Sequence, residues 1–227
     1  MINTLRHSEV FNAHEHNERI VIVGAGAIGS RVFENLVSTG LTNITLVDFD
    51  KVESHNLANQ LYVREDIGNL KVLAANRWCV AKCGQDVADS IRFINGKVDE
   101  HAIAWFTNAK IVISCVDTFD ARRVMSHMAS KSWSDMFIDT RMATGHCDMY
   151  MVNPDNPSDV KRWTDTLGDD DDPSYETSAC GESLSVGVTA QTIGAVTSWS
   201  VMNYLKTGFI DKHIRVDTAP WLVSRQV

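Results

Sequence analysis

Arg19–Val23 reads RIVIV and runs directly into residues 24–30, GAGAIGS, and this stretch decides the fold. The first part is a short continuous apolar run, which is typical of a parallel strand buried on both faces. The second part opens an amphipathic segment whose apolar residues recur every four positions: Ile28, Val32 and Leu36. Gly40 comes after that segment, as glycine often follows the end of a helix. The pattern predicts a strand, a tight turn and a helix.

Strands and helices continue to alternate along the chain. Short apolar runs predict strands at residues 44–47, 91–94, 110–116 and 136–138. Helices are predicted at residues 71–83, 101–107, 120–130 and 188–206. Right-handed crossovers between such units give a parallel sheet with helices on both faces, and residues 213–223 add one or two strands. We therefore predict an α/β, Rossmann-like fold with a mostly parallel sheet and additional C-terminal strands.

The glycines after the first strand form a GxGxxG pattern. Glycine permits the tight turn and a close approach of ligand to backbone, and the N–H groups that begin the helix bind phosphate. In this strand–turn–helix context the pattern predicts nucleotide binding by Gly24, Gly26, Ala27 and Gly29. The pattern by itself also fits a turn that binds no ligand.

Carboxylates follow two more of the predicted strands. Asp48 and Asp50 end the second strand, and Asp117 ends the strand at residues 110–116. Ligands of parallel sheets bind beyond the carboxyl ends of the strands, so we expect the glycines and carboxylates to converge. Asp48 stands where an acidic side chain accepts hydrogen bonds from ribose hydroxyls. That position suits NAD and ATP equally.

The segment after the second strand distinguishes between these two cofactors. Residues 48–60 read DFDKVESHNLANQ, and residues 66–71 read DIGNLK. They resemble the segment that reads D-x-D-x-V, S-N-L-x-R-Q and D-x-G-x-x-K in adenylyltransferases of the ubiquitin-activating superfamily. The pattern is most similar to the bacterial MoeB and ThiF type, which adenylates sulfur-carrier proteins. The resemblance extends from Ile20 to Asp117, and more loosely to residues 188–206.

The resemblance implies an ATP-dependent adenylyltransferase that works as a homodimer. The substrate carboxylate would be the C-terminal glycine of a ubiquitin-like or sulfur-carrier protein, activated as an acyl-adenylate with release of pyrophosphate. Two alternative functions stay open. One is a non-catalytic nucleotide- or partner-binding member of the same fold. The other is an NAD(P)-linked oxidoreductase, although the rest of the chain offers no evident hydride-transfer site.

The resemblance also assigns roles to five polar residues. Lys71 matches the lysine that contacts the phosphates, a task that suits a point charge. Asp117 matches the aspartate that places Mg²⁺ on the triphosphate, because this hard ion prefers oxygen ligands. Asp48 would hold the ribose, and Asn56 would hydrogen-bond near the phosphates. Asp50 takes the matching second acidic position.

The chain departs from the family pattern at two positions. Asn59 stands where the family has an arginine that is expected to bind phosphate, and His55 replaces the serine. Arg64 is a candidate substitute for that arginine. Relatives also extend an arginine from an N-terminal arm into the partner subunit's site, and Arg6 and Arg19 are candidates for it.

The cysteines give two further expectations. Cys180 precedes residues 188–206 as the thioester-forming cysteine of some relatives precedes a similar helix. A thiolate near a helix N-terminus is favoured by the helix dipole, although many free cysteines are only small buried hydrophobes. Many relatives hold zinc with two C-x-x-C pairs, and this sequence has none. We therefore expect no structural zinc.

Composition and charge limit the class of protein. The chain has 227 residues, 44% of them hydrophobic, which suffices for one core. A net charge of −8 argues against nucleic acid as a partner, since phosphate binding needs a basic face. No apolar run approaches the roughly 20 residues that span a bilayer, so no membrane partner is expected. Five cysteines without a signal peptide indicate reduced thiols in the cytoplasm.

The domain organisation follows from the same patterns. We expect a polar N-terminal arm at residues 1–18 and a single ATP-binding adenylation domain at residues 19–227. Residues 153–183 contain three of the four prolines and the run Asp169–Asp172, which indicates a long acidic crossover loop.

Overall fold

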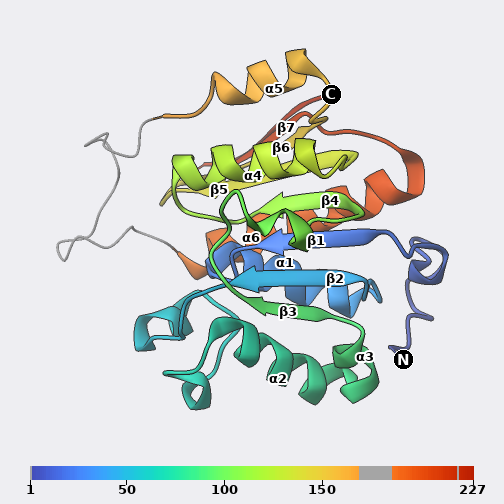
Figure 1. Cartoon of the computed structure of the whole chain (residues 1–227), viewed down its shortest axis with the longest axis vertical. Helices are drawn as coiled ribbons and strands as arrows, with labels where there is room; N and C mark the ends of the chain where they lie inside the picture. Colours follow the sequence, from blue (N-terminus) through green and yellow to red (C-terminus); the bar gives the residue numbers. More distant parts are fainter. Residues whose placement is uncertain (1, 169–185, 219) are drawn as a thin grey trace.

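The computed structural model describes residues 2–168, 186–218 and 220–227, which form one sheet between two layers of helices (Figure 1). Its strands are β1 (Arg19–Val23), β2 (Ile44–Asp48), β3 (Arg92–Asn95), β4 (Ala109–Ser114), β5 (Met136–Met142), β6 (His146–Val152), β7 (His213–Thr218) and β8 (Trp221–Gln226). Its α-helices are α1 (Ala27–Ser38), α2 (Lys71–Cys83), α3 (Gln85–Asp89), α4 (Phe119–Lys131), α5 (Pro157–Thr164) and α6 (Gly187–Thr207). Short 3₁₀ helices lie at η1 (Ala13–Glu15), η2 (Ser54–Ala58), η3 (Arg64–Asp66) and η4 (Ala102–Trp105).

The order of the strands across the sheet is β3-β2-β1-β4-β5-β6-β7-β8. Strands β1 to β5 are parallel, whereas β6, β7 and β8 pair antiparallel. The chain crosses to the far side of β1 between β3 and β4, so the carboxyl ends of β1 and β4 flank the point where the order reverses. Ligands of open parallel sheets bind at such a point. The predicted fold class is confirmed.

Both faces of β1, β2 and β4 are covered, which explains their largely apolar sequences. Along β1, Ile20 and Ile22 pack against α1, α2 and α6, while Val21 and Val23 pack against η4, α4 and α5. All four side chains are buried. Burying an aliphatic side chain of this size contributes about 1.5–3 kcal/mol, so such strands hold the two layers together. In the described part of the chain, no helix has the length and apolar character needed to cross a membrane.

The prediction of a long loop at residues 153–183 is wrong for its first part, because Pro157–Thr164 forms α5. The side chain of Asn156 accepts hydrogen bonds from the N–H groups of Ser158 and Asp159, and Pro157 occupies the first turn. Both features favour the start of a helix. Residues 169–185, the remainder of the expected loop, lie outside the described residues.

Strand β6 was not predicted, although its sequence carries a signal for it. Cys147, Met149 and Met151 alternate with polar residues and point into the core beside α6. This period of two is typical of a strand with one buried face. Methionine and cysteine are weaker strand formers than β-branched residues, and this composition concealed the pattern.

The N-terminal segment packs against the domain. Phe11 and Ala13 are buried in the same core as α1, and the Phe11 ring stacks on His16 with 4.9 Å between ring centroids. The fold therefore includes part of the segment that we expected to be an arm.

Candidate nucleotide site

The turn between β1 and α1 depends on two glycines that approach main-chain atoms closely. A Cβ atom on Gly24 would lie 2.6 Å from the carbonyl oxygen of Cys115, at the end of β4. Gly24 also has a φ of +92°, which favours glycine. A Cβ atom on Gly29 would lie 1.7 Å from the carbonyl oxygen of Gly24. The two glycines thus bring β1, β4 and the start of α1 together.

Gly26 has a different environment, because among the described residues no atom beyond its own chain neighbours lies within 4 Å of its Cβ position. It is the N-cap of α1, it makes no side-chain cap, and the first turn of α1 contains no acidic residue. The first N–H groups of a helix lack partners within the helix and carry partial positive charge. The open side of this turn is therefore suited to an anion such as a phosphate.

Asp48, the last residue of β2, holds this turn from the next strand. Its side chain is almost buried, with 8% exposed. One carboxylate oxygen accepts a hydrogen bond from the N–H of Ala25 at 2.6 Å, and the other accepts one from the N–H of Asp50 at 2.7 Å. Burial raises the pKa of Asp48 above its usual value, and the positive charge of Lys71 offsets part of that rise. The predicted ribose acceptor is thus also a support of the glycine turn.

Lys71 and Asp50 form an ion pair at the start of α2. The Lys71 Nζ atom lies 2.9 Å from an Asp50 carboxylate oxygen, and the Lys71 N–H donates to the Asp50 carbonyl at 2.9 Å. The side chain of Lys71 is 9% exposed, whereas that of Asp50 is 48% exposed. A lysine buried to this degree is uncommon without a partner. The pair therefore holds a positive charge beside the carboxyl edge of the sheet.

The connection between β2 and α2 lies at this same edge (Figure 1). Asn56 is buried in η2, and its side-chain oxygen accepts a hydrogen bond from the N–H of Glu53 at 2.8 Å. Asn56 therefore shapes this connection. Any contact of Asn56 with a phosphate stays a prediction.

The candidate arginines occupy different places. Arg64 begins η3 and is exposed. Arg19 lies at the opposite, amino edge of the sheet, where it donates to the carbonyl oxygen of Trp105 at 2.9 Å and to Thr45 at 3.1 Å. Arg19 is therefore remote from the nucleotide site of its own chain.

Asp117 lies in an exposed bend after β4. The residue before it, Val116, contributes the N atom that lies 3.4 Å from the Cβ position of Gly24. The residue after it, Thr118, caps α4 by accepting a hydrogen bond from the N–H of Ala121 at 3.3 Å. Asp117 is thus held between the glycine turn and the start of α4. The remaining predicted residue, Cys180, lies outside the described residues.

Two supports of this edge were missed in the sequence. The first is Tyr62, whose hydroxyl donates to the carbonyl oxygen of Ala25 at 2.7 Å. No sequence motif predicts this role of Tyr62, because a tyrosine after an apolar residue is typical of an ordinary core residue.

The second support is Asp139, which is fully buried in β5. It accepts hydrogen bonds from Arg122 of α4, from Arg141 at 2.8 Å and from Trp163 of α5 at 2.9 Å. These bonds tie two helices to the carboxyl half of β5. An aspartate that follows the apolar run Met136–Ile138 was the available signal, since Asp48 and Asp117 follow apolar runs in the same way.

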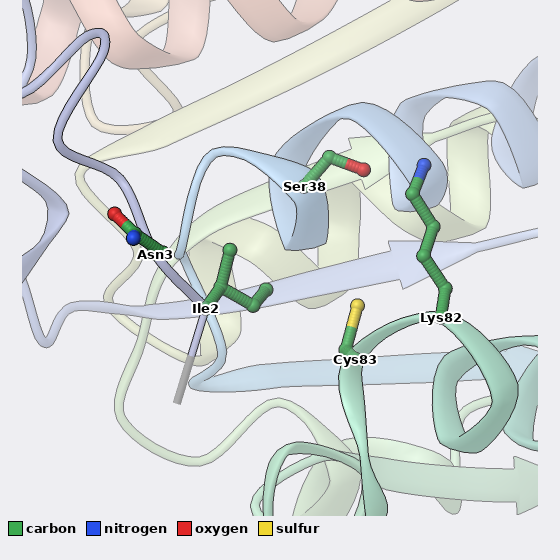
Figure 2. A pocket seen from close by; sticks show the side chains of 5 residues that line it. All are labelled: Ile2, Asn3, Ser38, Lys82 and Cys83. Atoms are coloured by element: carbon green, nitrogen blue, oxygen red, sulfur yellow. The ribbon is translucent and has the colours of Figure 1, made fainter.

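A small cavity of about 250 Å³ lies elsewhere, between the N-terminal segment and the C-terminal ends of α1 and α2. Figure 2 shows the side chains that line it: Ile2, Asn3, Ser38, Lys82 and Cys83. It is at the other end of α1 from the glycine turn, a separation of roughly 15–20 Å for a helix of this length. We therefore do not assign the nucleotide to this cavity.

Comparison with known sequences identifies related proteins. The ThiF family matches residues 8–219 of the chain. "Ubiquitin-like modifier-activating enzyme 5" of Dictyostelium discoideum is 27% identical over 162 residues, which cover 64% of this chain and 42% of that protein. "SUMO-activating enzyme subunit 2" of the same organism is 32% identical over 111 residues, which cover 48% of this chain and 17% of that protein. The chain spans less than half the length of these relatives.

Solved structures share the fold. The structure described as "Crystal structure of E. coli MccB + ATP" superposes with a TM-score of 0.70 at 16% identity. The match covers 92% of this chain and 63% of that one. At this level of identity the likeness supports the fold.

The glycine turn gives a test of its geometry. We expect Gly29→Ala to lower the free energy of unfolding by about 3 kcal/mol, because its methyl group would collide with the Gly24 carbonyl, which cannot move freely. Gly26→Ala meets open space and is expected to cost about 1 kcal/mol or less, mainly from a poorer N-cap. Urea unfolding of both variants measures the difference. Equal losses in the two variants would contradict the described turn.

Proposed function

The chain belongs to the ThiF family, and from this premise we propose that it is an ATP-dependent adenylyltransferase. It activates a carboxylate as an acyl-adenylate and releases pyrophosphate. We further propose that the carboxylate is the C-terminal glycine of a ubiquitin-like or sulfur-carrier protein.

One observation carries the proposal, namely the convergence of three strand ends on the glycine turn. The N–H of Ala25 is held by Asp48 from β2, and Gly24 contacts the end of β4 directly before Asp117. The buried ammonium of Lys71 lies at the same edge. Backbone donors, one cation and two carboxylates are the groups that a nucleotide triphosphate with a metal ion requires.

The proposed reaction needs stabilisation of growing negative charge. A substrate carboxylate oxygen attacks the α-phosphorus, and the bond from that phosphorus to the α–β bridging oxygen breaks. Pyrophosphate leaves with the bonding electron pair. The N–H groups at the start of α1 and the ammonium of Lys71 stabilise this charge. Asp50 keeps Lys71 oriented in the site until the phosphates become its partner.

Asp117 suits a magnesium ion. Its carboxylate is exposed at the site, and within the described ranges no three His, Cys, Asp or Glu side chains gather as a metal site. Magnesium is usually bound by one or two carboxylates, with phosphate oxygens and water as the other ligands. Bound there, the ion would neutralise phosphate charge.

The other predicted residues complete the site. Asp48 would accept hydrogen bonds from the ribose, since each of its oxygens retains a lone pair beside the bond it already makes. Asn56 would hydrogen-bond near the phosphates, and Gly26 and Ala27 would offer their N–H groups to them. In a second step, the Cys180 thiolate would attack the acyl carbon of the acyl-adenylate, and the bond to the phosphate oxygen would break, leaving a thioester and free AMP.

The substrate class follows from the relatives. Those matched in sequence are named as activating enzymes for ubiquitin-like modifiers and SUMO, and the matched E. coli MccB structure is described with ATP. We transfer this chemistry, a carboxyl terminus activated by ATP, to the present chain. We also propose that residues 19–227, together with the packed segment that contains Phe11 and Ala13, act as one cytoplasmic domain.

We propose in addition that the protein is a homodimer that associates through the α6–β8 face. This face comprises apolar side chains of α6 and β8 that are all more than half exposed: Val188, Trp199, Trp221 and Val223. A hollow of about 610 Å³ lies between the two elements, lined in part by Asn203 and Arg225. Trp199 and Trp221 are 58% and 64% exposed. Strand β8 is also an edge strand, which invites pairing.

The exposed apolar area of these four side chains supplies most of what a dimer interface needs. Large apolar side chains exposed to this degree present on the order of 100 Å² each. A two-fold axis uses the same patch on both subunits. The buried total then approaches the roughly 1,000 Å² at which specific interfaces begin.

The adenylation proposal is tested by ATP–pyrophosphate exchange with a panel of ubiquitin-like and sulfur-carrier proteins that end in glycine. We expect exchange with at least one of them, and a loss of roughly 100-fold or more in Lys71→Ala, because one charged donor to the transition state is removed. The matched control is Lys82→Ala at the other end of α2, which should exchange normally. ATP binding without exchange for any carrier would instead favour a non-catalytic binding protein.

The dimer is tested by sedimentation velocity at micromolar concentration. We expect a dimer for the wild type and a monomer for Trp221→Glu, because a charge would be buried in the apolar contact. Trp133→Glu is the control, since Trp133 is 82% exposed on the opposite layer, after α4. A wild-type monomer would contradict the proposed interface.

The role of Cys180 is tested by thiol reactivity at pH 7.5. Burial raises the pKa of Cys79 and Cys115 to about 12 and that of Cys147 to about 11, and it also raises the pKa of Cys83. Because pH 7.5 lies below these values, the four described thiols stay protonated and react slowly. With a disulfide reagent, we expect one fast-reacting thiol in the wild type. The fast reaction should be lost in Cys180→Ser and kept in Cys83→Ser. A fast thiol that persists in Cys180→Ser would contradict a nucleophilic Cys180.

A further inference from the structure

Tyr62 is a buried residue with a bond to the glycine turn that the proposed reaction has not used. It lies between η2 and η3, and 5% of it is exposed. Its hydroxyl donates a hydrogen bond of 2.7 Å to the carbonyl oxygen of Ala25, which is itself fully buried. Burial, together with the charges of Asp48 and Asp66, raises the pKa of Tyr62 well above its usual value. The hydroxyl therefore remains a donor at every pH at which the protein is used.

The two polar groups of Ala25 are thus held from two different elements. Asp48, at the end of β2, accepts from the N–H of Ala25 at 2.6 Å. Tyr62 donates to the carbonyl of the same residue. The peptide group before Ala25 is further fixed because the Gly24 carbonyl lies against Gly29.

The orientation of one carbonyl determines that of the next N–H. In a trans peptide group the C=O and the following N–H point in opposite directions. The Ala25 carbonyl points inward to Tyr62, so the N–H of Gly26 points away from Tyr62. Around Gly26 the described residues leave open space, since none of their atoms beyond its chain neighbours lies within 4 Å of its Cβ position.

The alternative orientation would be unfavourable for a phosphate. If the peptide group between Ala25 and Gly26 turned over, its carbonyl oxygen would point to the open side and repel an anion. Glycine at position 26 removes much of the steric barrier to such a rotation, because it has no Cβ atom. The hydroxyl of Tyr62 stabilises only the orientation in which the N–H faces outward.

We propose that Tyr62 is a positioning residue that orients the Gly26 N–H toward a phosphate group of the bound nucleotide. This inference rests on the proposed nucleotide site and goes beyond it, because it assigns phosphate recognition to a side chain that never touches the ligand. Tyr62 acts through the Ala25 carbonyl, and it distinguishes ligands that carry phosphate from ligands that do not.

The test compares ATP with adenosine in the wild type and in Tyr62→Phe. Phenylalanine keeps the ring in the core and removes only the hydroxyl, so a single hydrogen bond is lost. We expect the affinity for ATP to fall roughly three- to tenfold, the change that corresponds to one hydrogen bond. The affinity for adenosine should stay unchanged. Calorimetry measures the affinity for ATP, and NMR titration measures the weaker affinity for adenosine.

A matched control is Tyr204→Phe. Tyr204 is a partly buried tyrosine of α6, close to Asp135 at the amino edge of the sheet. We expect this variant to bind ATP and adenosine as the wild type does. A loss of adenosine affinity equal to that of ATP in Tyr62→Phe would indicate general damage to the fold and would overturn the positioning role.

A measurement on the wild type covers the case in which Tyr62→Phe does not fold. The amide resonance of Gly26 should shift on addition of ATP and remain in place with adenosine. If ATP binds but leaves the Gly26 amide unshifted, the inference fails while the nucleotide site stands. If the wild type binds neither ligand, the nucleotide site itself fails, and the inference fails with it.

Discussion

The hydrogen bond between the Asp48 carboxylate and the Ala25 N–H joins strand β2 to the glycine turn, the two features on which the nucleotide site is built. It connects the end of β2 to the turn after β1 over a distance of 2.6 Å, and Asp48 is only 8% exposed. A buried carboxylate is costly unless hydrogen bonds satisfy it, and here two backbone N–H groups do so. The same carboxylate fixes Asp50, which in turn holds Lys71. The Asp48 carboxylate thus helps to hold both the turn and the cation, and Tyr62 and the close approach of Gly24 to Cys115 also hold the turn.

The site is built almost entirely from main-chain geometry and from charges held by short connections. The sheet brings β1 and β4 side by side, and Gly24 lets their ends touch. The connection at residues 51–70 returns to the same edge through a bridge between Lys51 and Leu70, directly before Lys71. Because these elements end at the carboxyl edge of the sheet, main-chain groups supply most of the candidate contacts to a nucleotide, and few side chains are needed for them. The rest of the chain supplies rigidity, as Asp139 does for β5, α4 and α5.

The parallel strands and the C-terminal strands β7 and β8 were predicted from the sequence, whereas β6 was not. Strands such as β1 and β4 are buried on both faces, so their sequences are continuous apolar runs that end sharply in glycine or aspartate. Strand β6 places Asp148 and Tyr150 between its methionine and cysteine core residues, which gives a weaker pattern. Helix α5 begins with Asn156 and Pro157, a helix start that looked like part of a loop. For both β6 and α5 the local sequence carried a signal for the element. That signal could be interpreted only from what packs against the element.

The sequence by itself determined the strand–turn–helix unit, the GxGxxG turn, the positions of Asp48 and Lys71 at element ends, and that of Asp117 shortly after β4. These follow from local constraints: where only glycine fits, where apolar runs stop, and which charges come directly after them. Only the tertiary structure decided that Tyr62 meets Ala25, that Asp50 partners Lys71, and that α6 and β8 leave apolar side chains exposed. Each of these is a contact, or the lack of one, between elements distant in the chain. No local pattern specifies such contacts, because they depend on how the whole sheet assembles.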